Sequence, residues 1–317
     1  MLSGFENISS VIKVKMMPQN QLSDIFMLVR LDNPLIFYVE NFKMRWAENA
    51  SHIEILPEYM FDKSKIKTHI QAVNARIDRL KRELKCETTS KTLLAIHDFI
   101  CNNIKYDKLK KAYSHEIIGP LTHGIGVCDG ISKTVKVLCD TFNIECVIPL
   151  SEADPDNGVK YRHAWNVVKL DGKWYHCDFT YDNSLGRYGV LRYDYCNLDD
   201  KRIYRDHRLP IFGIPECTDS GNFYYKTQKL SYTKIEDVKN RISQALRKKK
   251  ETFLFHWRGG YLTREVLTEI LTAAAEAAAA HEKFVRASIN YAQSVILLVF
   301  TADSPLQPET EEVPDEA

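Results

Sequence analysis

Apolar residues recur every three or four positions in two stretches of the chain, and this period predicts two amphipathic helices. The first helix covers residues 64–84, where an apolar stripe lies opposite a strongly charged face. The second covers residues 90–104, which show the same spacing. A charged helical face is usually solvated, so the first helix is expected to support the fold rather than to bind nucleic acid.

Two short apolar runs precede these helices and predict strands. They are residues 25–31 (IFMLVRL) and residues 35–40 (LIFYVE). Together with the charged helix they predict an N-terminal α/β support domain over residues 1–85.

After Pro215, strand-like and helix-like segments alternate, which predicts a small α/β domain over residues 216–301. Thr233 and Glu236 have the spacing of a capping box and predict the start of a helix. A second helix is predicted at residues 265–284, which include an alanine-rich stretch of high helix propensity. The strand-like segments are residues 224–230, 252–257 and 289–300. Beyond them, residues 302–317 are acidic and have little to bury, so a disordered tail is predicted.

The middle segment, residues 86–215, contains a cysteine enclosed by glycines. Gly124, Gly126 and Gly130 allow close backbone approach and unusual dihedral angles around Cys128. Apolar positions after Cys128 fall on one helical face, which places this residue near the N-terminus of a helix. Free N–H groups and the helix dipole stabilise an anion there, which lowers the pKa of a thiol and supplies donors for an oxyanion.

A hairpin is predicted downstream, because Asp171-Gly172 is a strong two-residue turn signal between two apolar runs. In the resulting register Trp165 lies opposite Asp178, and His163 lies opposite Thr180. These four side chains share one face, since side chains alternate along a strand. His163 and Asp178 are then diagonal neighbours at about 7–8 Å, a separation that their side chains can close.

These residues predict a catalytic triad. A nucleophilic thiol needs a base for its proton, and the base needs a partner that fixes its tautomer. Cys128, His163 and Asp178 are expected to fill these roles. A single cysteine is more often a buried structural residue, and only the combination favours catalysis. Support is expected from four neighbours: Trp165, Asn166, Thr180 and Asp182. For Asn166 and Asp182 a role in a turn is an equal alternative.

The three stretches also resemble the cysteine, histidine and aspartate boxes of the transglutaminase-like superfamily, particularly its bacterial members. The boxes are residues 126–132 (GVCDGIS), 162–166 (RHAWN) and 178–182 (DFTYD). The flanking segments at residues 97–98, 105–107, 195–199 and 206–207 agree as well, so that the resemblance covers about residues 86–209. It is specific because the three boxes occur in the expected order and spacing.

This resemblance implies a papain-like α+β core with a cysteine-bearing helix packed on an antiparallel sheet, flanked by smaller α/β segments. Cys128 would attack a carboxamide or peptide carbonyl, and an amine or water would resolve the thioester. His163 would deprotonate the thiol and protonate the leaving group, Asp178 would orient His163, and the N–H of Cys128 would bind the oxyanion.

The chain departs from the family pattern next to the nucleophile. Many relatives have an aromatic residue where this chain has Ile131 and a glutamine where it has Asp129. An acid beside the thiol is expected to raise the thiol pKa unless it points away. The second oxyanion donor stays open among four residues: Tyr106, Tyr113, His115 and His123. No metal or cofactor is expected, since nothing resembles the calcium-binding loops of animal transglutaminases.

Composition narrows the partners and the compartment. The formal net charge of +1 gives no overall field for nucleic acid or an anionic membrane, so the expected partner is a protein or peptide substrate. The eight cysteines are expected to be free thiols, and the missing signal peptide predicts a cytoplasmic protein. The longest strongly apolar run, residues 294–300, is too short to span a bilayer. The oligomeric state is left open.

Three functions are weighed. Thioester chemistry that ends in hydrolysis of peptide or amide bonds is at least as well supported as crosslinking. The alternative is an inactive binding or scaffold module that keeps the fold. A serine triad through Ser132 is discounted, because Ser132 lies a helical turn beyond Cys128 and no G-x-S-x-G motif is present.

Overall fold

The computed structural model describes residues 1–47, 50–157, 159–186 and 189–303. Helices and short, mainly antiparallel sheets are mixed along the chain, which confirms the predicted α+β class. Within the described residues, no helix is both long and apolar enough to cross a membrane. Residues 304–317, which make up most of the predicted acidic tail, lie outside the described residues.

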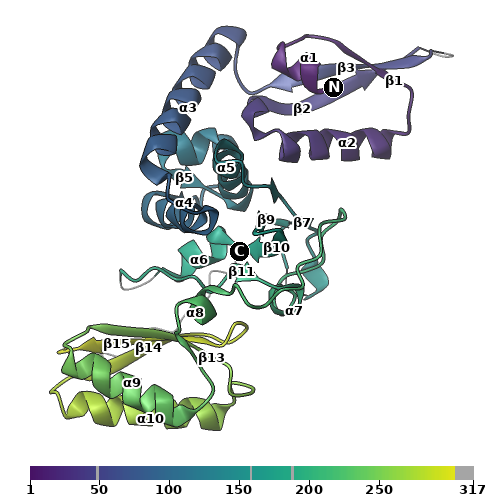
Figure 1. Ribbon diagram of the computed structural model, residues 1–317. Coiled ribbons are helices and arrows are strands. Elements are labelled where there is room, and N and C mark those ends of the chain that lie inside the picture. The colour runs from purple at the N-terminus through teal and green to yellow at the C-terminus, as the bar shows by residue number, and fades with distance from the viewer. Residues whose placement is uncertain (48–49, 158, 187–188, 304–317) are drawn as a thin grey trace.

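The N-terminal segment forms a three-stranded sheet in the order β1-β3-β2 (Figure 1). Its elements are α1 (Leu2–Glu6), β1 (Ile12–Lys15), α2 (Gln19–Asp32), η1 (Pro34–Ile36), β2 (Val39–Arg45) and β3 (His52–Tyr59). The strand predicted at residues 25–31 is wrong, because these residues lie in α2. Its buried positions Leu22, Phe26 and Leu31 belong to a helical stripe that starts before the apolar run. The strand predicted at residues 35–40 is wrong in its first four residues, since β2 begins only at Val39.

Both helices that the apolar period predicts are present, as α3 (Lys63–Leu84) and α4 (Thr89–Asn103). The side chain of Asp62 caps α3 by accepting hydrogen bonds from two N–H groups of its first turn. α3 leads from the N-terminal sheet to the central segment (Figure 1), and one apolar cluster continues from Phe5 to Cys196. The domain boundaries at residues 85 and 215 stay predictions.

The central segment packs helix α5 against a four-stranded antiparallel sheet in the order β11-β10-β9-β6. Its elements are β4 (Lys105–Tyr106), η2 (Ala112–His115), η3 (Gly119–His123), β5 (Ile125–Gly126), α5 (Cys128–Thr141), β6 (Cys146–Val147), β7 (Leu150–Ser151), η4 (Pro155–Asn157), β8 (His163–Ala164), β9 (Asn166–Leu170), β10 (Lys173–Cys177), α6 (Phe179–Leu185), β11 (Cys196–Leu198) and α7 (Asp200–Ile203). The turn Asp171-Gly172 has positive φ angles of 50° and 82°, and Leu170 pairs with Lys173 as predicted.

The hairpin is shorter than predicted at its open end. β10 stops at Cys177, and Asp178 is the N-cap of helix α6, so Thr180 lies in a helix and not on a strand opposite His163. His163 itself lies in β8, which pairs with β7 instead of β10. The predicted shared face of four strand residues is therefore wrong. The side chain of Asp178 accepts hydrogen bonds from two N–H groups of the first turn of α6. This cap favours the start of a helix over further pairing of the strand beyond Cys177.

The C-terminal segment is a four-stranded sheet in the order β12-β13-β15-β14, with helices α9 and α10 on one face (Figure 1). Its elements are α8 (Tyr224–Thr227), β12 (Ser231–Tyr232), α9 (Ile235–Arg247), β13 (Thr252–Trp257), α10 (Arg264–Ala279), β14 (Phe284–Asn290) and β15 (Val295–Thr301). The predicted strand at residues 224–230 is wrong, since it contains the short helix α8. The predicted capping box is also wrong, because the N-cap of α9 is Lys234 and no side chain caps that helix.

Candidate active site

The loop before the nucleophile is held by Asp107. Its carboxylate accepts hydrogen bonds from the backbone N–H groups of Leu109 and Lys111 and from the hydroxyl of Ser114. The carbonyl of Ser114 in turn accepts from the N–H of Val127, at 3.0 Å. These bonds fix the residue that immediately precedes helix α5.

Cys128 is the first residue of α5, where the sequence predicts it. Backbone N–H groups in the first turn of a helix have no acceptor within the helix, so they remain available to an anion. Close packing of the preceding loop requires the neighbouring glycine: a Cβ atom at Gly130 would lie 2.2 Å from the carbonyl oxygen of Ser114. Gly124 has a φ angle of 65°, a conformation that favours glycine.

His163 and Asp178 form a buried pair. Nε2 of His163 lies 2.6 Å from Oδ2 of Asp178, and the two residues are 5% and 0% exposed. Burial works against the charged imidazole, but the charge and hydrogen bond of Asp178 and the nearby Cys128 thiol raise the pKa of His163 to about 10. Nε2 donates to the carboxylate, so Nδ1 is the nitrogen left to take a proton from Cys128.

Asp178 is held by four donors. Its Oδ1 accepts hydrogen bonds from the backbone N–H groups of Thr180 and Tyr181, at 2.9 and 3.0 Å, and these bonds cap α6. Its Oδ2 accepts from His163 and also from His207. Burial disfavours the carboxylate, but the charge and hydrogen bonds of the two imidazoles outweigh burial and lower the pKa of Asp178 below its ordinary value.

His207 is the residue of this site that the sequence reasoning missed. A structural or surface role is the default for a single histidine, and the Asp206-His207 pair stands out only as a flanking segment of the family resemblance. The structure places Nε2 of His207 at 2.9 Å from Asp178, although 29 residues separate the two along the chain. No periodicity or spacing rule links these positions.

Trp165 and Asn166 connect the site to its surroundings. The fully buried indole of Trp165 stacks on His163 at a centroid distance of 5.9 Å, and its Nε1 donates to Nδ1 of His176 at 3.0 Å. Nδ2 of Asn166 donates to the carbonyl of Ser132 at 3.0 Å, which ties the sheet to helix α5. Both residues lie where they can support the triad.

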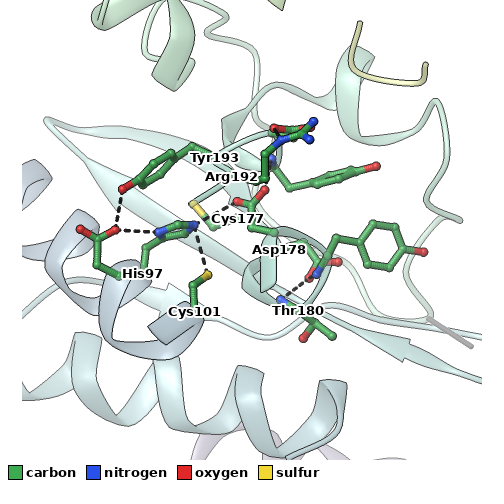
Figure 2. Close-up of polar contacts among 12 residues, drawn as sticks. His97, Cys101, Cys177, Asp178, Thr180, Arg192 and Tyr193 are labelled. Carbon is green, nitrogen blue, oxygen red and sulfur yellow. Dashed lines mark hydrogen bonds and ion pairs between the residues drawn. The ribbon is translucent and has the colours of Figure 1, made fainter. Parts of the chain in front are cut away.

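Thr180 and Asp182 do not touch His163 through hydrogen bonds. Thr180 contributes its backbone N–H to Asp178, as Figure 2 shows. Asp182 is fully buried and faces another imidazole, because its Oδ2 lies 3.3 Å from Nε2 of His97. The same nitrogen of His97 contacts the thiol of Cys101 (Figure 2). Burial, opposed in part by His97, raises the pKa of Asp182 to about 7. Asp182 therefore belongs to a neighbouring cluster with His97 and Cys101 of α4.

The four candidates for a second oxyanion donor have different surroundings in the structure. Tyr113 and His123 pack against each other at 4.8 Å, and His115 lies 3.3 Å from the carboxylate of Asp129. Tyr106 is on β4, in register with Gly126 just before the nucleophile, so it stays the candidate next to the loop.

The carboxylate of Asp129 is paired with the imidazole of His115 and lies in the field of Lys133. Desolvation opposes its charged form, but the hydrogen bond to His115 and the charge of Lys133 outweigh desolvation and lower its pKa. A carboxylate that is paired in this way opposes a neighbouring thiolate less than an unpaired one does.

Two groups of three side chains bring possible metal-ligand atoms within 4.8 Å of one another in the described part of the chain: His163, Asp178 and His207, and His176, Asp200 and Cys217. In the first group both Nε2 atoms donate to the same carboxylate oxygen. In the second, Nδ1 of His176 accepts from Trp165, so Nε2 carries the proton that it donates to Asp200 at 2.8 Å. Hydrogen bonds within each group account for the closeness of these side chains.

The other reactive side chains have ordinary surroundings. All eight cysteines are free thiols, as expected, and five of them are buried. The hydroxyl of Ser132 donates to the carbonyl of Ala164 at 3.0 Å, which explains its position without a catalytic role.

Comparison with known proteins finds a similarity to one family over part of the chain. Residues 78–179 match a family model described as the transglutaminase-like superfamily, which confirms the resemblance for that segment. His207 lies outside the matched residues. The comparison with curated proteins found no significant match.

Three solved structures are similar at low identity. One is described as a TGase, with 12% identity and a TM-score of 0.31, and the match covers 54% of this chain and 51% of that one. A candidate cysteine protease from Cytophaga hutchinsonii has 17% identity and a TM-score of 0.29, and the match covers 44% and 62%. A candidate protease from Parabacteroides distasonis has 12% identity and a TM-score of 0.27, and the match covers 44% and 36%. The chain thus spans less than two thirds of the length of each.

Proposed function

We propose that this chain, which carries a transglutaminase-like core over residues 78–179, is a thiol-dependent enzyme that acts on peptide or glutamine amide bonds. Cys128 is the proposed nucleophile, His163 the base and acid, and Asp178 the group that orients His163. The observation that carries the proposal is the buried contact of 2.6 Å between His163 and Asp178, next to a cysteine at a helix N-terminus.

The proposed reaction has two halves. In the first, Nδ1 of His163 takes the thiol proton, and the sulfur of Cys128 attacks the carbonyl carbon. The C–N bond then breaks, and the leaving ammonia or amine takes the proton from His163, which leaves a thioester. In the second half, water or an amine loses its proton to His163, attacks the thioester and releases the thiol.

Both outcomes share the thioester and differ in the second nucleophile. Access of water favours hydrolysis, and exclusion of water favours transfer to an amine. A cavity of about 370 Å³ has in its lining Asp129, which follows Cys128, and Arg162, which precedes His163, but none of the three triad residues. Both apolar and charged residues line this cavity, a composition that suits a segment of a peptide or protein substrate.

The first test is the rate at which iodoacetamide alkylates Cys128, measured across pH by peptide mass spectrometry. We expect fast labelling well below pH ~8.5, the ordinary thiol pKa, and its loss in His163→Ala. The exposed residue His281 offers a matched control, and His281→Ala should label like the unmodified chain. The exposed Cys86 and the partly exposed Cys101 provide an internal reference in every sample, because the reagent can reach them without unfolding.

An inactive binding or scaffold module is the alternative. The same labelling measurement distinguishes this module from the enzyme. A scaffold has no reason to activate one thiol among eight. Labelling of Cys128 at the rate of Cys86 and Cys101, unchanged in His163→Ala, would reject the enzyme and favour the scaffold. If Cys128 is activated, a glutamine-containing peptide with and without a primary amine then separates hydrolysis from transfer, by the masses of the products.

A further inference from the structure

The carboxylate oxygen that orients His163 is shared with a second imidazole. Oδ2 of Asp178 lies 2.6 Å from Nε2 of His163 and 2.9 Å from Nε2 of His207. The two rings meet edge to face with centroids 5.3 Å apart, and the His207 side chain is fully buried. A histidine in this position contacts the same atom as the proposed base.

The other nitrogen of His207 also faces a carboxylate. Nδ1 lies 2.8 Å from Oδ1 of Asp206, whose Oδ2 accepts a hydrogen bond from the hydroxyl of Tyr195 at 2.6 Å. An imidazole that meets carboxylate oxygens at both nitrogens donates to both only when it is doubly protonated. Burial opposes that charge, but the hydrogen bonds of Asp178 and Asp206 raise the pKa of His207 above its ordinary value.

Few other titratable groups face this ring. Tyr181 of α6 lies at a centroid distance of 4.6 Å and Tyr195 at 5.5 Å, and burial keeps the pKa of both phenols above the ordinary value. The thiol of Cys128 interacts with His163 and is a further titratable group near this pair of rings. The titratable neighbours of His207 and His163 thus include Asp178, Asp206, Tyr181, Tyr195 and Cys128, and the charge of His207 also acts on His176.

We infer that His207 is a positioning residue, held as a cation between Asp178 and Asp206, which fixes the Asp178 carboxylate and offsets part of its charge toward His163. The inference rests on the proposed function, because it concerns how the base of that reaction is tuned. If Asp178 served His163 alone, its full negative charge would bind the proton of His163 more tightly. An imidazole that keeps its proton cannot protonate a leaving amine. The positive charge of His207 also favours the thiolate of Cys128.

The C-terminal segment helps to place His207. The backbone N–H of His207 donates to the carbonyl of Ile203 at the end of α7. The turn between β14 and β15 forms hydrogen bonds with α7 and with the chain just after it. Nε2 of Gln293 donates to the carbonyl of Arg202, and Arg205 donates to the carbonyl of Ala292. A segment outside the matched family residues thereby supports a contact with Asp178.

The kinetic test uses His207→Gln in the full chain, since glutamine keeps an N–H donor but carries no charge. We expect the midpoint pH of Cys128 alkylation to rise by about 1 unit, which corresponds to about tenfold slower labelling below the midpoint. His97→Gln is the matched control, because His97 is also buried and also faces two carboxylates, those of Asp98 and Asp182, but makes no hydrogen bond to Asp178. An unchanged midpoint in folded His207→Gln would overturn the inference.

A second measurement does not depend on catalysis. In the spectrum of ¹⁵N-histidine-labelled protein at pH 8, we expect the ring of His207 to be doubly protonated. The variant Asp206→Asn, which alters a partly exposed side chain, identifies the signal and should remove one of the two protons. A neutral His207 at pH 8 would refute the charged role, even where His207→Gln fails to fold. If Cys128 itself proves unreactive, the proposed function fails, and this spectrum still decides the charge of His207.

Discussion

Removing the charge of Asp178 should destabilise the protein in a manner that depends on pH. Asp178→Asn keeps the size of the side chain, and asparagine still caps a helix well. It removes the carboxylate that accepts from His163 at 2.6 Å inside the protein. The imidazole then loses the partner that supports its charge, while its burial is unchanged.

The size of the effect follows from the pKa of His163, which lies at about 10 against an ordinary value of 6.5. Since one pKa unit corresponds to about 1.4 kcal/mol, the neighbours of His163 favour its protonated form by about 5 kcal/mol. Asp178 supplies most of this energy and Cys128 the rest. Breaking one side of a buried ion pair costs about 3–5 kcal/mol, so a loss of that size is expected near neutral pH.

The sign of the pH dependence is determined by the raised pKa. A group that binds its proton more tightly in the folded state contributes its full stability below pH 6.5 and loses it as the pH rises through about 10. The difference between the unmodified chain and Asp178→Asn should therefore shrink by about 1.4 kcal/mol per pH unit between pH ~7 and ~10.

Urea denaturation of both proteins at several pH values measures this difference in the free energy of unfolding. Asp78→Asn is the matched control, because Asp78 is exposed on α3 and should cost less than about 0.5 kcal/mol. A loss below about 1 kcal/mol for Asp178→Asn at pH 7, or an equal loss at pH 7 and pH 10, would refute the reasoning.

Two further substitutions test the packing around the site. In Gly130→Ala the new methyl group would lie 2.2 Å from the Ser114 carbonyl, so we expect a loss of about 1–3 kcal/mol in urea denaturation and slower labelling of Cys128; Gly213→Ala, where a Cβ atom meets nothing within 4 Å, should be nearly neutral. Arg192→Met removes the cationic partner of the fully buried Asp194 carboxylate, at 2.6 Å, and leaves it only the hydroxyl of Tyr225. We expect a loss of about 3–5 kcal/mol in the same assay, whereas a loss under about 1 kcal/mol would contradict a buried ion pair.

Where the sequence reasoning fails, the cause is local ambiguity. Residues 25–31 form a short apolar run, which a strand and a buried helix share, and α2 includes this run in a longer helical stripe. The strand register predicted from Asp171-Gly172 is correct as far as Cys177. The prediction extends the strand beyond Cys177, where the backbone instead forms helix α6. His163 and Asp178 meet all the same, through a helix cap and a separate strand in place of an extended hairpin.

The sequence by itself determined the features that neighbouring residues control: the helices α3 and α4 from apolar spacing, the tight turn at Asp171-Gly172, and Cys128 at the start of α5. Only the tertiary structure decided that His207 reaches Asp178. That contact depends on where the chain runs after α7. Residues in the turn between β14 and β15, some 85 residues further along the chain than His207, hold this region by hydrogen bonds. Periodicity and turn chemistry act over a few residues, whereas such a contact arises from burial summed over the whole core, which no local pattern records.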